Sequence, residues 1–86
     1  MTKTIYRYRL EITDKQVVPM PKGSVILSAQ TKGETISLWA LCNPTEIKVP
    51  RYFEIFGTGN PVSEGKKKYI ATCQIGEMVW HLFERI

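Results

Sequence analysis

Apolar and polar residues alternate with a period of two along almost the whole chain. The stretch from Tyr6 to Ile12 shows this alternation most clearly. No window places apolar residues at positions i, i+3, i+4 and i+7 between recognisable helix caps. Successive side chains of a strand point to opposite faces, so a period of two is typical of strands with a buried face. The alternation therefore predicts an all-β protein.

The expected strands are short, and turn-forming residues separate them. They cover residues 4–12, 16–18, 24–31, 35–42, 51–57, 67–75 and 78–84. At 86 residues the chain has the length of one small domain. Six to seven short strands joined by hairpin-sized turns predict a single β domain over residues 1–86, built as a small antiparallel barrel or sandwich.

The first two strands carry specific expectations. Along residues 4–12, Tyr6 and Tyr8 should face the core, while Arg7 and Arg9 point the other way and make that face basic. The second strand should stop before Pro19, because a proline cannot donate a hydrogen bond to the ladder.

Two other strands are apolar on both faces. Residues 38–41 read Leu-Trp-Ala-Leu, and residues 78–84 are apolar on both sides apart from His81. Such strands belong inside a sheet or at an interface. We expect Trp39, Trp80 and His81 to lie at an interface, with a satisfied core histidine as the other interpretation of His81. Pairing with a second copy would also hide the edges of so small a sheet. The chain is therefore expected to form a homo-oligomer.

The composition restricts the classes of partner. The net charge of +4 favours anionic partners, which include nucleic acid, a phosphorylated small molecule and an acidic protein. The N-terminal residues lack the apolar core of a secretory signal, and no apolar run approaches the roughly 18 residues of a membrane span. These features predict a cytoplasmic protein without a membrane partner.

The sequence shows no catalytic or metal-binding signature. Cys42 and Cys73 lack the spacing of a zinc site and are expected to be reduced, buried thiols. His81 is the single histidine, and neither paired carboxylates nor a nucleophile in a recognisable setting appear. We therefore expect a protein that is not an enzyme and that needs no cofactor and no metal.

A glycine-containing segment followed by lysines is the candidate ligand site. Glycines let backbone N–H groups approach an anion, but a phosphate-binding fingerprint needs a helix after the glycines, and here Pro61 and more strand follow. A plain turn with glycines at positive φ is the other interpretation. If the glycine turn and the lysines lie at the same end of the sheet, they form a basic site. The residues expected to contact an anionic ligand there are Arg51, Gly57, Thr58, Gly59, Asn60, Lys66, Lys67 and Lys68.

Four ordered motifs resemble one family of proteins. They are ILSAQ at residues 26–30, LWAL at 38–41, FGTGNP at 56–61 and VWHLFE at 79–84. The chain is similar to a family of short phage and prophage proteins known as a domain of unknown function. In that family a histidine often follows the Gly-Thr-Gly, where this chain has Asn60, so a chemical role of that histidine would not carry over. The resemblance implies a viral accessory protein in a host cell and supplies no activity.

These expectations combine into one leading hypothesis. The chain would be a phage-derived, non-enzymatic, homo-oligomeric binding protein that sequesters an anionic ligand, such as a nucleotide immune signal, as a counter-defence. The alternatives are an inhibitor or adaptor that acts on a host protein and a nucleic-acid binder. In the first strand the tyrosines point to the opposite face from the arginines, so aromatic and basic side chains do not share one face there. This weakens the nucleic-acid hypothesis.

Overall fold

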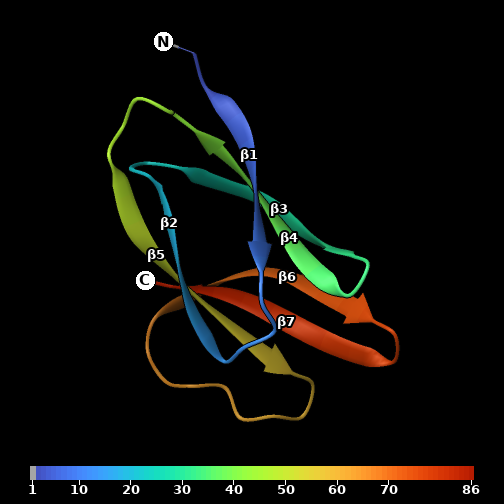
Figure 1. Ribbon diagram of the computed structural model, residues 1–86. Helices are drawn as coiled ribbons and strands as arrows, with labels where there is room; N and C mark the ends of the chain where they lie inside the picture. Colours follow the sequence, from blue (N-terminus) through green and yellow to red (C-terminus); the bar gives the residue numbers. More distant parts are fainter. Residues whose placement is uncertain (1) are drawn as a thin grey trace.

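The computed structural model describes residues 2–86 as seven strands and no helix (Figure 1). The strands are β1 (Thr4–Leu10), β2 (Lys15–Pro21), β3 (Val25–Lys32), β4 (Thr35–Cys42), β5 (Lys48–Gly57), β6 (Lys67–Ile75) and β7 (Met78–Arg85). The all-β prediction is confirmed, and the expected bounds of β4 and β6 are the observed ones.

The strands form two antiparallel sheets. One sheet has the order β1-β4-β3, and the other has the order β2-β5-β7-β6. The edge strands β3 and β6 approach each other, and the Thr31 hydroxyl donates a hydrogen bond of 2.9 Å to the carbonyl of Gln74. The sheets do not close into a continuous barrel, so of the two predicted architectures the chain adopts the sandwich (Figure 1).

The alternation along the strands produces the core between the sheets. Leu38 and Ala40 of β4 face Leu82 of β7 and Ile55 of β5 across this layer, and all four are at most 2% exposed. The other buried apolar residues of this cluster are Leu10, Met20, Ala29, Ile36, Cys42, Phe53 and Cys73. Cys42 and Cys73 are free thiols, as the sequence predicts for small buried side chains.

Both strands that are apolar on two faces lie inside a sheet. β4 is between β1 and β3, and β7 is between β5 and β6. This confirms that both strands lie inside a sheet, which was one of their two expected positions.

The prediction that β2 stops before its prolines was wrong. β2 continues to Pro21, and Pro19 lies directly opposite Pro50 of β5, which the sequence also placed in a loop. In an antiparallel pair, alternate positions have N–H groups that point away from the partner strand. Two opposed prolines fit such a position, because neither missing N–H is needed for pairing.

The prediction that β1 extends to residue 12 was also wrong. The strand ends at Leu10, and the Gln16 side chain bonds both backbone groups of Glu11, which turns the chain toward β2. Ile12 is consequently 36% exposed, and Tyr6, expected in the core, is 37% exposed at the far end of β1. Leu10 and the half-buried Tyr8 are the residues of β1 that enter the core.

Candidate functional site

The glycine segment after β5 forms a β-turn. The N–H of Asn60 donates to the carbonyl of Gly57 at 3.0 Å, and Gly59 has a φ of 89° at the third turn position, where glycine is favoured. A Cβ on Gly57 would lie 2.9 Å from the amide nitrogen of Asn60 and 3.2 Å from the ring of Trp80. The requirements of the turn thus explain both glycines, and contact with a ligand stays a prediction.

The basic residues do not converge on this turn within one chain. Gly57 is opposite Trp80 near the start of β7, whereas Lys67 is opposite Arg85 at its end. Because β5 and β6 both run antiparallel to β7, the end of β5 and the start of β6 lie at opposite ends of the sheet. The condition for the predicted basic site, that both lie at the same end, is therefore not met.

Arg51 connects the two sheets. Its guanidinium pairs with the carboxylate of Glu84, with Nη2 2.9 Å from Oε1, and its Nη1 donates to the backbone carbonyl of Ser24 at 2.8 Å. The hydrogen bond to Glu84 raises the pKa of Arg51, against the opposing effect of burial. The sequence analysis predicted that this guanidinium contacts a ligand. In the structure its partners are Glu84 of β7 and Ser24, the residue before β3.

Glu54 is the charged residue that sequence reasoning missed. Although it points to the outer face of β5, it is 2% exposed, and its carboxylate accepts hydrogen bonds from Ser63 at 2.9 Å and from Arg85 at 3.1 Å. Lys67 lies 3.4 Å away. Burial raises the pKa of the Glu54 carboxyl, but the bonds from Ser63 and Arg85 and the charges of Arg85 and Lys67 outweigh it, so the pKa is lowered.

The same two cations hold the segment 58–66 against the sheet. Lys67 donates to the carbonyl of Ser63 at 2.6 Å, and Arg85 donates to the carbonyl of Glu64 at 2.9 Å. Lys67 is therefore committed to the fold, while Lys66 and Lys68 are exposed. A lone acidic residue between the apolar residues Phe53 and Ile55 was the available sequence signal for this cluster.

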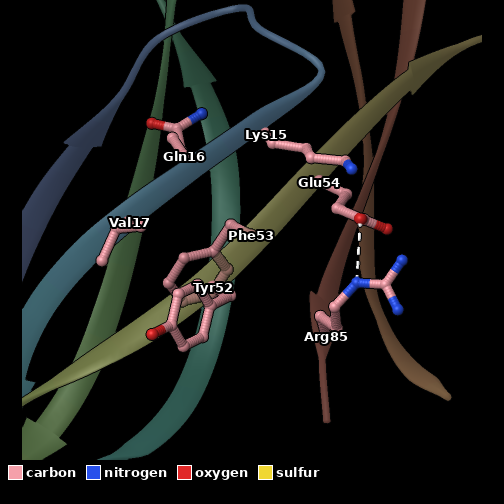
Figure 2. Close-up of a pocket in the computed structure, with 7 residues that line it drawn as sticks. All are labelled: Lys15, Gln16, Val17, Tyr52, Phe53, Glu54 and Arg85. Carbon is pink, nitrogen blue, oxygen red and sulfur yellow. Dashed lines mark hydrogen bonds and ion pairs between the residues drawn. The ribbon is translucent and has the colours of Figure 1, made fainter. Parts of the chain in front are cut away.

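Two adjoining hollows lie on the outer side of β2 and β5. The first, of about 310 Å³, is shown in Figure 2, where the ring of Tyr52 lies near Val17 and the chain of Lys15 extends toward Glu54 and Arg85. The second, of about 480 Å³, shares Lys15. It is lined by Asp14, Lys15, Phe56, Asn60, Pro61, Val62 and Ser63.

The residues predicted for an interface have separate positions. Trp80 packs against the core, and Trp39 is half-buried on the outer face of β4. His81 is on the outer face of β7, with Nε2 2.8 Å from the hydroxyl of Thr58 and Nδ1 3.1 Å from the hydroxyl of Thr72. Both ring nitrogens therefore have partners within the chain, and an interface role for the three residues stays a prediction.

Metal-ligating clusters and membrane-spanning helices are both missing from the described part of the chain. Residues 2–86 contain no group of three or more His, Cys, Asp or Glu side chains that could hold a metal ion. Nor do these residues include a helix with the length and hydropathy that a membrane crossing requires.

Comparison with known proteins gives one match. The model of a family described as "Domain of unknown function (DUF7352)" matches residues 1–86. No curated protein and no solved structure matches the chain.

Proposed function

The chain belongs to the DUF7352 family of domains of unknown function, and from the geometry of its own residues we propose that it is a non-enzymatic binding protein. Its ligand is a small anion that carries a planar ring, as a nucleotide does. The ligand occupies the two hollows that meet at Lys15, with the ring against Tyr52 and the anionic group near the Lys15 ammonium.

The observation that carries this proposal is that one continuous stretch, residues 52–61, contributes to both hollows. Each hollow falls at the lower end of the range of about 300–1,000 Å³ that is usual for small-molecule sites. Tyr52 is 50% exposed, so the face of its ring can receive a base or another flat ring.

The charge distribution favours an anion at Lys15. Glu54 would repel an anion, but Arg85 and Lys67 neutralise its carboxylate. Lys15 itself is exposed where the two hollows meet, and Asp14 lies on the side of the second hollow. A ligand that places its ring in the first hollow therefore meets one accessible ammonium and a compensated ion cluster.

We also propose a biological role for this binding. A phage accessory protein that removes a nucleotide immune signal from a host cell needs binding without turnover, and the proposed site supplies a ring platform at Tyr52 and a cation at Lys15. The family resemblance of the sequence and the net charge of +4 support this role. Assembly as a homo-oligomer belongs to the same proposal.

Isothermal titration with ADP-ribose and with cyclic dinucleotides tests the binding. We expect Lys15→Ala and Tyr52→Ala each to weaken binding at least tenfold, and Tyr52→Phe to retain most of it because the ring remains. Lys48→Ala is the matched control, since Lys48 is also exposed but lines neither hollow. An equal loss in Lys48→Ala would show that only the net charge matters.

Native mass spectrometry of protein from expressing cells measures the bound ligand and the number of subunits. The absence of a bound nucleotide, together with no heat in any titration, would contradict the proposal. An adaptor that acts on a host protein predicts instead the retention of one protein at stoichiometric yield in a pull-down, with no dependence on Tyr52 or Lys15.

A further inference from the structure

The outer face of the other sheet carries a strongly basic hollow. Arg7 and Arg9 of β1 and Lys32 of β3 surround a space of about 260 Å³, together with Thr35 and Ser37 of β4. None of the described residues that line it has a carboxylate. Glu34, in the adjoining turn, is outside this lining. Three cations therefore share one small surface without a compensating acid.

The strand register explains how this hollow forms. Arg9 is opposite Ser37, and Lys32 is opposite Thr35, so the central strand presents small side chains between long basic ones. Ser37 is only 2% exposed, which places it at the floor. Long cations on both edge strands and short residues on the middle strand produce a trough across the sheet.

An aromatic ring lies next to the trough. Trp39 is directly opposite Arg7, and it alternates with Leu38 and Ala40, which are fully buried on the core side. Trp39 is half-buried and shares the outer face with the two arginines. The sequence pattern of β1 placed its tyrosines away from its arginines, but the register supplies the missing aromatic residue from β4.

We propose that this face binds single-stranded nucleic acid. Arg7, Arg9 and Lys32 contact the phosphates, and an unpaired base stacks on Trp39. Proteins that bind single-stranded nucleic acid without sequence preference combine basic residues with aromatic rings. The basic residues contact the backbone, and any base can stack on a ring because every base has a stacking face. Arg7 and Arg9 are two residues apart, or about 6.5 Å along the strand, so the two guanidinium groups can engage separate phosphates. This site is independent of the hollows at Lys15.

Fluorescence anisotropy with fluorescein-labelled oligo(dT) measures the binding. We expect the double variant Arg7→Ala/Arg9→Ala to weaken binding at least tenfold. The double variant Lys66→Ala/Lys68→Ala removes the same number of charges from exposed positions just before and at the start of β6, and we expect it to change the dissociation constant less than threefold. Thermal denaturation of both variants shows that each is folded.

Salt dependence separates phosphate binding from a general charge effect. Between about 50 and 200 mM salt, the slope of log K against log salt should become shallower by about 0.7 for each phosphate that a variant no longer neutralises. Arg7→Ala/Arg9→Ala should reduce this slope, whereas Trp39→Ala should weaken binding and leave the slope unchanged. Trp39→Phe keeps a ring on the face and should restore binding.

Four outcomes would overturn the inference. One is the absence of salt-dependent binding of oligo(dT) at low salt, and another is an equal loss of affinity in the two double variants. The third is competition by polyglutamate as effective as by unlabelled oligo(dT), which would identify an acidic protein as the partner. Tighter binding of duplex DNA than of oligo(dT) would also contradict stacking on Trp39.

Discussion

Replacing Glu54 by Gln tests whether the buried ion cluster holds the segment 58–66 on the sheet. The substitution keeps the size of the side chain and removes its charge, which leaves Lys67 and Arg85 without a carboxylate. Removing one partner of a buried ion pair costs roughly 3–5 kcal/mol. The Arg85 side chain is 35% exposed and regains water, and Lys67 keeps the carbonyl of Ser63. We therefore expect a loss of about 2–3 kcal/mol.

Such a loss is large for this protein. A chain of 86 residues has an unfolding free energy of roughly 4–13 kcal/mol, and its urea m-value is about 1 kcal/mol/M. The urea midpoint should fall by about 2–3 M. Hydrogen exchange at the backbone amide of Ile86 should also accelerate, because this amide donates to the carbonyl of Lys66 at the end of the segment.

The pH dependence gives an independent check of the same reasoning. The pKa of Glu54 is lowered in the folded state, so its contribution is fully present above the ordinary carboxyl pKa of about 4.3 and disappears as the pH falls through the lowered value. The stability difference between the wild type and Glu54→Gln should therefore shrink in acid.

Glu64→Gln is the matched control, since Glu64 is exposed in the same segment. It should change the unfolding free energy by less than about 0.5 kcal/mol. Equal urea midpoints for the two variants, or a difference that stays constant from neutral to acid pH, would refute the argument.

Three further predictions concern the fold. Leu82→Ala should cost about 2–5 kcal/mol in urea unfolding, because Leu82 is fully buried in the core, and an unchanged midpoint would contradict the assignment of that core. Gly57→Ala should cost about 1–3 kcal/mol through the contacts of its Cβ with Asn60 and Trp80, and wild-type thermal stability in this variant would show that the turn can relax. Burial raises the pKa of Tyr8 to about 12, so the protonated hydroxyl of Tyr8 contributes to the free energy of unfolding. This contribution is fully present below the ordinary tyrosine pKa of about 10 and is lost as the pH rises through about 12. In a spectrophotometric titration, Tyr8→Phe should remove the one step of tyrosinate absorbance that is centred near pH 12, and a titration curve with that step unchanged would refute the shift.

The fold could be predicted from the sequence where local patterning decides it. The alternation in β4 and β6 identified both strands, and the two-sided apolar character of β4 and β7 predicted a position inside a sheet or at an interface, of which the structure has the first. The prolines of β2 and β5 could not be placed in the same way. Whether Pro19 is tolerated depends on its lying opposite Pro50, and that register is a tertiary property.

The candidate site was less predictable, for a related reason. Charged residues on the outer side of a strand usually face water, so the pattern of β5 alone does not predict that Glu54 is buried with Ser63, Lys67 and Arg85 as its partners. These partners come from a loop and two other strands, and no local pattern brings them together. The separation of Lys66–Lys68 from the glycine turn likewise follows from the direction of β6, which spacing along the chain does not specify.

The opposed prolines of β2 and β5 also restrict how copies of this chain can add to one another. An edge strand offers its outward N–H and C=O groups as a template for another strand. Pro19 removes one of these donors from the free edge of β2, and β3 and β6 cover part of each other's edges. β1 contains no proline over Thr4–Leu10 and pairs with β4 on one side. The edge of β1 is thus free of proline over Thr4–Leu10, and strand addition between two copies at that edge would give a closed pair rather than an open filament.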